Sequence, residues 1–193
     1  MRLGMVIDLS RCFGCNACTL ACKQANATPV GIHFTKMEIS ETGKYPNAKQ
    51  TYMSHICQHC ENAPCVEVCP TGASKKNADG TVTVTAEECI GCESCIDVCP
   101  YDARKLYERS QSYWGDKGET ADEAARADRY REETVLKCDF CQRRRNKGQV
   151  PACVETCPAV ARIFGDLDDP NSEVSKPAKI AKPYKPEEGT KPN

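Results

Sequence analysis

The sequence predicts an α+β fold of two pseudo-symmetric modules with short hairpins and helices, followed by an extended C-terminal arm. Two observations predict it. The 193 residues include sixteen cysteines, which fall into four groups of four. Three of these groups end in the same pattern, Cys-Pro-x-x-Ala, at residues 69–73, 99–103 and 157–161. An internal repeat of this kind indicates duplicated modules.

The third cysteine group has the most specific spacing. Cys89, Cys92, Cys95 and Cys99, followed by Pro100, form a C-x2-C-x2-C-x3-C-P run, which is typical of [4Fe–4S] clusters in bacterial ferredoxins. Three thiolates in one tight loop can bind three corners of a cubane, whereas the fourth usually serves a second cluster. The pattern therefore predicts bacterial-ferredoxin-like modules with paired clusters.

The other three groups vary this spacing. The first has Lys23 where the proline would stand, the second has a wider middle gap that contains Pro64, and the fourth has an eleven-residue gap that contains Arg143–Arg145. All sixteen cysteines are nevertheless expected to bind iron. They are Cys12, Cys15, Cys18 and Cys22; Cys57, Cys60, Cys65 and Cys69; Cys89, Cys92, Cys95 and Cys99; and Cys138, Cys141, Cys153 and Cys157.

The fourth cysteine of one group should serve the cluster of its paired group. Groups two and three are close in sequence, which favours pairing them and leaves groups one and four to pair across the chain. The rival pairing, one with two and three with four, stays open on spacing alone. The favoured ligand sets are Cys12, Cys15, Cys18 with Cys157; Cys138, Cys141, Cys153 with Cys22; Cys57, Cys60, Cys65 with Cys99; and Cys89, Cys92, Cys95 with Cys69.

The regular elements expected between the groups are short. Strands are expected at Met5–Leu9, Phe34–Ile39 and Tyr52–Ile56. A hairpin is expected at residues 73–85, because an Asp-Gly pair precedes a run of alternating β-branched residues. A mostly exposed helix is expected over residues 120–133, where Thr120 and Glu123 form a capping box.

These elements divide the chain into segments. The first module is expected to combine two distant stretches, and the lysine- and proline-rich end should be disordered or laid on a partner. The segments are 1–28 and 135–167 for the first module, 52–107 for the second module, 29–51 for a connector, 108–134 for an inserted helical segment and 168–193 for the extended tail.

Composition restricts the function. A mean hydropathy of −0.57 with 6% aromatic residues indicates a thin core, so the protein is expected not to fold without its metal clusters. The formal net charge is −1. Cluster thiolates would bring the assembled protein to roughly −9, which argues against nucleic-acid binding. No secretory signal or run of about 20 apolar residues is present, so neither disulfides nor a membrane span is expected.

Residues 1 to about 170 resemble the four-cluster iron–sulfur subunit of the molybdopterin oxidoreductases, of the dimethyl sulfoxide, polysulfide and arsenate reductase type. The resemblance rests on Ile7-Asp8-Leu9-Ser10-Arg11-Cys12, Cys57-Gln58-His59-Cys60-Glu61-Asn62-Ala63-Pro64-Cys65, Cys99-Pro100-Tyr101-Asp102-Ala103-Arg104 and Pro151-Ala152-Cys153-Val154-Glu155-Thr156-Cys157-Pro158. The family pairs group one with four and two with three. Because every ligand position here is cysteine, the resemblance implies four [4Fe–4S] clusters.

The resemblance also implies the partners. A large molybdopterin subunit with molybdenum or tungsten would carry out catalysis, next to the cluster of Cys12, Cys15, Cys18 and Cys157. The far end would meet a quinol-oxidising membrane subunit or a soluble donor. The chain would reside in the cytoplasm, or be exported folded with a partner that bears a twin-arginine signal, and it would associate with a membrane only through a partner.

The expected function is therefore electron transfer in anaerobic respiration, with no catalytic residues in this chain. One alternative is a free-standing soluble polyferredoxin without a fixed catalytic partner. Another is a structural zinc protein, in which two C-x2-C pairs would share a metal. Absorption at roughly 400 nm would distinguish iron–sulfur clusters from zinc.

Overall fold

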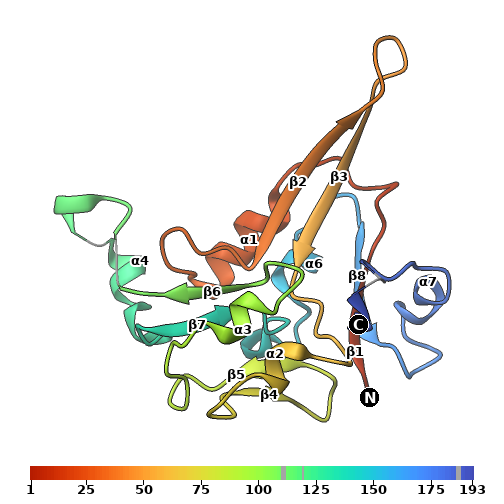
Figure 1. Ribbon diagram of the computed structural model, residues 1–193. Coiled ribbons are helices and arrows are strands. Elements are labelled where there is room, and N and C mark those ends of the chain that lie inside the picture. The colour runs from red at the N-terminus through yellow and green to blue at the C-terminus, as the bar shows by residue number, and fades with distance from the viewer. Residues whose placement is uncertain (110–111, 119, 186–187) are drawn as a thin grey trace.

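The computed structural model describes residues 1–109, 112–118, 120–185 and 188–193 (Figure 1). Parts of the expected inserted segment (110–111, 119) and tail (186–187) therefore lie outside the described residues. The strands are β1 Leu3–Ile7, β2 Thr35–Thr42, β3 Lys49–Ile56, β4 Ser74–Lys76, β5 Val82–Val84, β6 Arg104–Tyr107, β7 Thr134–Lys137 and β8 Arg162–Asp166. The helices are α1 Ala17–Asn26, α2 Pro64–Glu67, α3 Ser94–Asp97, α4 Ala121–Ala124, α5 Gln142–Arg145, α6 Ala152–Glu155 and α7 Ser175–Ala178, with 3-10 turns η1 Gly115–Lys117 and η2 Ala127–Arg129.

Two distant parts of the chain meet in the antiparallel pair β1–β8, whose register runs from Leu3 opposite Asp166 to Ile7 opposite Arg162. The strand expected at Met5–Leu9 is therefore present but displaced by two residues. It ends at Ile7 because the Asp8 carboxylate accepts hydrogen bonds from the Ser10 N–H at 2.9 Å and the Ser10 hydroxyl at 2.6 Å. Such a bond from an aspartate to the residue two positions on starts a turn.

The segment expected to be a polar connector contains a strand. β2 pairs along its whole length with β3, from Thr35 opposite Ile56 to Thr42 opposite Lys49, and the hairpin projects from the rest of the molecule (Figure 1). The two expected strands are confirmed, but each is longer than expected. The outer half of the hairpin is exposed on both faces, so its sequence lacks the apolar alternation that predicts a half-buried strand.

The hairpin expected at residues 73–85 is confirmed as β4–β5. Its turn is stabilised by the Asp79 carboxylate, which accepts hydrogen bonds from the Thr81 N–H at 3.0 Å and from the Thr81 hydroxyl at 2.6 Å. Gly80 has a φ of +80°, the left-handed conformation for which glycine is suited.

The β6–β7 pair joins the segment that follows the third cysteine group to the segment that precedes the fourth. Its register places Arg104 opposite Lys137 and Tyr107 opposite Thr134. All four residues of β7 are buried. Because β7 lies at the start of stretch 135–167 and β6 within stretch 52–107, this sheet connects the two expected modules.

The inserted segment is less helical than expected. The capping box is confirmed, since the Thr120 N–H donates to Glu123 Oε2 at 2.7 Å and the Glu123 N–H donates to Thr120 Oγ1 at 3.2 Å. However, α4 ends at Ala124 after about one turn. Beyond it, the chain packs on the end of α1: Arg126, Arg129 and Tyr130 donate hydrogen bonds to the carbonyls of Gln24, Ala25 and Asn26, which have no partner within their own helix. These tertiary bonds outweigh the local helix propensity of the segment.

The C-terminal tail lies on this chain itself, which corrects both expectations for it. After α7 it returns to the second cysteine group, where the Glu61 N–H donates to the Lys191 carbonyl at 2.9 Å and the Asn193 N–H donates to the Gln58 carbonyl at 3.0 Å. The Tyr101 hydroxyl also contacts the Thr190 hydroxyl. The tail thus finds in the cysteine loop the hydrogen-bonding partners that its own sequence lacks.

The larger apolar core combines ordinary apolar side chains with cysteines. Leu3, Phe34, Ile56, Tyr107, Leu136 and Phe140 pack there with Cys22, Cys57 and Cys138. A smaller core contains Ala73, Val135, Cys89 and Cys95. The cysteines are therefore part of the interior. Within the described parts of the chain, no helix has the length and apolar character needed to cross a membrane.

Candidate metal centres

Two cavities are each surrounded by four cysteines. The first, called site A here, is lined by Cys12, Cys15, Cys18 and Cys157, which come from the loop after β1, the start of α1 and the turn before β8. The second, called site D, is lined by Cys69, Cys89, Cys92 and Cys95, which surround α3 and the start of β4. In each, three cysteines come from one group and the fourth from another.

The other eight cysteines lie between these two cavities. In the set called site B, the Asn26 side-chain amide lies 3.4 Å from Cys22 Sγ and 3.6 Å from Cys141 Sγ, and the charges of Cys153 and Cys141 add to burial in raising the pKa of Cys22. The remaining member of this set is Cys138, whose pKa burial and Cys22 raise.

In the set called site C, the pKa of Cys65 is raised by burial and by the neighbouring thiols of Cys57 and Cys99. Burial also raises the pKa of Cys60 to about 11, with a further contribution from Cys57 and Cys65. These four thiols come from the second group and from the end of the third.

Each cysteine loop contains left-handed backbone. In the first loop, Gly14 has φ +73° and Asn16 has φ +60°; in the third, Gly91 has φ +66° and Glu93 has φ +61°. The equivalent positions of the two loops have nearly equal angles. Such turns let cysteines that are only three residues apart face one cavity, because a regular helix or strand would direct them elsewhere.

Gly91 provides a test of this loop geometry. A Cβ atom at Gly91 would lie 2.5 Å from the Glu133 carbonyl oxygen, whereas one at Gly72 (φ +69°) would meet nothing within 4 Å. Gly72→Ala is expected to cost about 1 kcal/mol through backbone conformation alone. Gly91→Ala adds the clash and should cost about 3 kcal/mol or more. Chemical denaturation of the two holoproteins measures both, and equal losses would contradict the clash.

Backbone N–H groups point at several of the sulfurs. The Ser74 N–H donates to Cys69 Sγ at 3.4 Å and the Ala161 N–H donates to Cys157 Sγ at 3.3 Å. Both amides follow the Cys-Pro-x-x-Ala repeat, and the small Ala73 and Ala161 at its end are almost fully buried. Hydrogen bonds to ligand sulfur raise the reduction potential of an iron–sulfur cluster.

The chemistry of the buried thiols fits iron–sulfur clusters. Burial raises the pKa of Cys22 to about 12 and that of Cys138 well above the usual range. Without a compensating positive charge these thiols would stay protonated, and iron ions supply that charge. Among the described residues, no three His, Cys, Asp or Glu side chains are arranged to hold a single metal ion.

Two buried arginines lie between these sites and were not expected from the sequence. Although burial alone would lower the pKa of Arg104, the charges of Cys65, Cys95 and Cys57 raise it. Arg162 responds in the same way to Cys153, Cys18 and Cys138. The repeat contained a signal for both, since each arginine directly follows a Cys-Pro-x-x-Ala copy.

His59 is also buried, although a loop or surface position was expected for it. Its Nδ1 atom accepts the Val82 N–H at 2.9 Å, and its ring stacks on Phe140 with 3.8 Å between the ring centroids. Burial lowers the pKa of His59 well below its usual value, so the ring is neutral. It therefore acts as a packing element between the second and fourth cysteine groups.

Comparison with known proteins agrees with this chemistry. One model of a 4Fe-4S dicluster domain matches residues 48–115 and 123–167, and a second matches residues 11–73. The arsenate respiratory reductase iron-sulfur subunit ArrB of Shewanella sp. (strain ANA-3) is 41% identical over 220 residues, which cover all of this chain and 94% of that protein. One of the subunits of the tetrathionate reductase of Salmonella typhimurium is 37% identical over 198 residues (100% and 70%), and protein NrfC of Escherichia coli is 42% identical over 198 residues (100% and 78%).

Sixteen cysteines in two dicluster domains define an iron–sulfur electron-transfer protein with four [4Fe–4S] clusters. The chain belongs to the 4Fe–4S dicluster family, and within it to the iron–sulfur subunits of the molybdopterin oxidoreductases. In this family, catalysis takes place in another subunit, so the residues described here serve electron transfer.

Proposed function

We propose that the sixteen cysteines form four ligand sets, which coincide with sites A to D. Every set combines three cysteines of one group with the fourth cysteine of its paired group. The sets are Cys12, Cys15, Cys18 and Cys157 (site A); Cys22, Cys138, Cys141 and Cys153 (site B); Cys57, Cys60, Cys65 and Cys99 (site C); and Cys69, Cys89, Cys92 and Cys95 (site D). The two cysteine-lined cavities support sites A and D, and the mutual effects of the thiols on their pKa values support the other two.

The same proposal includes two pseudo-symmetric modules. Residues 1–28 and 135–167 would hold sites A and B, and residues 52–107 would hold sites C and D. Equivalent features support it: a Cys-x-Gly-Cys loop at both site A and site D, and an arginine after the Cys-Pro-x-x-Ala copy in both modules. β7 lies at the junction, since it begins next to the first module and pairs with β6 of the second.

The four sites would form a linear path in the order A, B, C, D. The pKa of Cys153 in site B responds to Cys18 of site A, and the pKa of Cys138 in site B responds to Cys57 of site C. Arg104 lies near cysteines of both C and D. A [4Fe–4S] cluster accepts and donates one electron at a time. The chain's contribution is to hold the sites in sequence and to shield the inner two from water.

One observation carries this proposal: Cys15 of site A and Cys92 of site D are exposed, whereas the other fourteen cysteines are buried or half-buried. The neighbouring Phe13 and Ile90 are exposed apolar side chains at equivalent loop positions, 56% and 64% accessible. Exposed apolar groups at both ends of the path are suited to contact with other subunits.

The partners would be a large catalytic subunit with molybdopterin-bound molybdenum or tungsten at site A, and a quinol-linked membrane subunit or soluble carrier at site D. The names of the relatives, which include arsenate and tetrathionate reductase subunits, support a reductase complex. We infer that the chain meets a membrane only through such a partner, whether it resides in the cytoplasm or is exported folded with a twin-arginine-signalled partner.

Phe13→Asp and Ile90→Asp test the two ends as a matched pair. Both variants should keep about sixteen irons per chain, because neither position is a ligand. Phe13→Asp should lose the catalytic subunit on purification from the native host. Ile90→Asp should keep it but lose reduction by the donor. Retention of the catalytic subunit and normal reduction in both variants would favour the alternative, a free-standing polyferredoxin.

A further inference from the structure

Three cationic side chains are buried in the interior. Arg104 is 1% exposed, Arg162 is 3% exposed and Lys137 is 6% exposed. Lysine and arginine are almost never fully buried unless a charge or strong hydrogen-bond acceptors compensate them, because removal from water penalises the charged form. Their positions therefore require a compensating partner.

Within the chain that partner is not a carboxylate. Among the described residues, the ion pairs leave out all three of these cations. Arg104 Nη1 donates to Ser74 Oγ at 2.8 Å, Arg162 Nη2 donates to Ser54 Oγ and Lys137 Nζ donates to the Val82 carbonyl. These acceptors are neutral. In the described parts of the chain, the buried Arg104 Nη2 atom has no oxygen or nitrogen partner.

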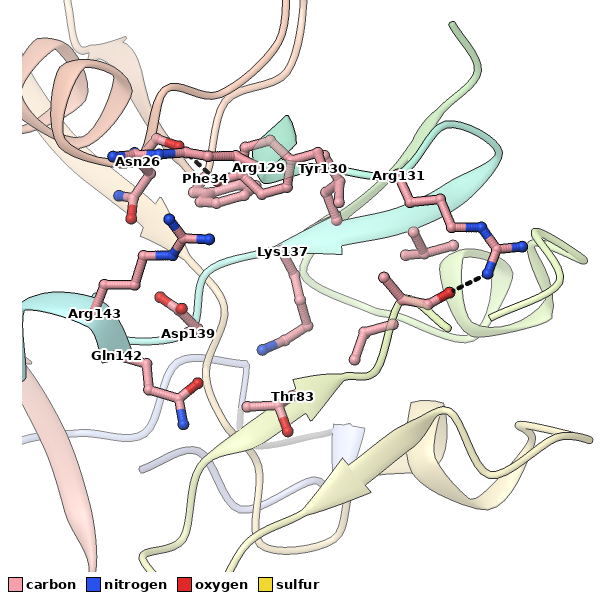
Figure 2. A pocket seen from close by; sticks show the side chains of 14 residues that line it. Asn26, Phe34, Thr83, Arg129, Tyr130, Arg131, Lys137, Asp139, Gln142 and Arg143 are labelled. Atoms are coloured by element: carbon pink, nitrogen blue, oxygen red, sulfur yellow. Dashed lines mark hydrogen bonds between the residues drawn. The ribbon is translucent and has the colours of Figure 1, made fainter. Parts of the chain in front are cut away.

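Two of the cations even lie opposite each other. Arg104 of β6 and Lys137 of β7 are directly paired across the antiparallel strands, so their side chains leave the same face of the sheet. Like charges in this arrangement repel each other, and burial strengthens the repulsion. Figure 2 shows Lys137 extending from β7 toward β5, the strand that carries Thr83. The arrangement requires negative charge nearby.

The cysteine sites supply it, and each cation lies at a different junction between them. Arg162 lies beside Cys18 of site A and Cys153 of site B. Lys137 lowers the pKa of Cys138 in site B and of Cys65 in site C, although burial outweighs it at both thiols. Arg104 lies beside Cys65 of site C and Cys95 of site D.

We propose that Arg162, Lys137 and Arg104 are positioning residues for electron transfer, one at each junction of the path from site A to site D. Each raises the reduction potentials of the two sites that it separates, and each weakens the repulsion between electrons held on those two sites. The inference rests on the proposed ligand sets.

The physical basis is the change in charge on reduction. When a site accepts one electron from its donor, its net charge becomes more negative by one unit, and the electron leaves again to the next site without any bond being made or broken. A fixed cation between two sites stabilises the reduced form of both. In the water-poor interior this effect is stronger than at the surface, because the medium screens it less.

Arg104→Gln and Arg104→Lys form the test, in the complete chain purified with its native partners. Redox titration followed by EPR measures the midpoint potential of each cluster. Arg104→Gln should shift the potentials of sites C and D downward and leave those of sites A and B almost unchanged. Arg104→Lys should restore most of the shift, because it keeps the charge. Arg162→Gln should give the mirror result, with sites A and B shifted.

Arg145→Gln is the matched control. Arg145 is also mostly shielded, but the Asp79 carboxylate lies 3.3 Å from its guanidinium, so its charge is already compensated. Its removal should shift the potentials less than Arg104→Gln does. Equal shifts at all four sites, or failure of Arg104→Lys to restore the potentials, would reduce these residues to a structural role.

Iron content separates this inference from the ligand sets. A variant that keeps about sixteen irons and unshifted potentials overturns the role of the cations but leaves the ligand sets intact. If Arg104→Gln does not assemble its clusters, Arg162→Gln provides the same measurement in the other module. Wrong ligand sets would instead appear in cysteine variants as loss of the wrong cluster.

Discussion

Removal of iron from this chain is expected to unfold most of it. Five cysteines of the larger and smaller cores are 8% exposed or less and have no disulfide partner: Cys22, Cys57, Cys89, Cys95 and Cys138. Structural metal sites contribute about 10–16 kcal/mol in zinc-finger peptides, as much as the total stability of an ordinary domain. Without iron, sulfur-lined interior space and the unpaired cations Arg104, Lys137 and Arg162 would remain, and both destabilise the folded state.

Far-UV circular dichroism before and after anaerobic chelation measures this loss. We expect the cooperative thermal transition of the holoprotein to disappear and to return when iron and sulfide are restored. Trp114 is 56% exposed, so its fluorescence is a poor reporter and should change little. A cooperative transition that survives in the iron-free protein would show that the apolar cores alone stabilise the fold.

Paired cysteine substitutions are expected to reveal which thiols share a cluster. If Cys65 and Cys99 bind the same cluster, Cys65→Ala with Cys99→Ala should remove one cluster and leave about twelve irons per chain. Cys99→Ala with Cys153→Ala should remove two clusters and leave about eight. The rival pairing of groups three and four predicts the opposite, because Cys99 would then complete the cluster of Cys153.

The readout combines iron analysis with the EPR spectrum of the reduced protein. The two double variants are matched controls, since each removes two buried or half-buried thiols. The single variants should each keep about twelve irons, whichever pairing holds. Equal iron content in the two double variants would contradict both pairings.

The parts of the structure that the sequence predicted are those determined by local chemistry. Cysteine spacing predicts the cluster loops because three ligands must reach one metal group from a short segment. The turn at Asp79–Gly80 and the capping box at Thr120 likewise depend on residues within a few positions of each other, and both are present. The clusters themselves agree with the family to which the chain belongs.

The parts that could not be predicted depend on distant contacts. The helix at α4 stops early because Arg126 and its neighbours bond to the end of α1, which lies about a hundred residues earlier in the chain. The tail is ordered by the second cysteine loop. Arg104 and Arg162 look like ordinary surface arginines in the sequence, because nothing local reveals that they are buried beside thiols.

The β1–β8 pair has a consequence for the synthesis of the chain. β1 leaves the ribosome first, but its partner strand begins only at Arg162, near the end of translation. The hairpin β4–β5 and the third cysteine group are complete by Cys99. Domains generally fold as their segments emerge. The central part of the molecule is therefore ready for cluster insertion well before the two ends meet, and the N-terminal cysteines must stay reduced and unpaired during that interval.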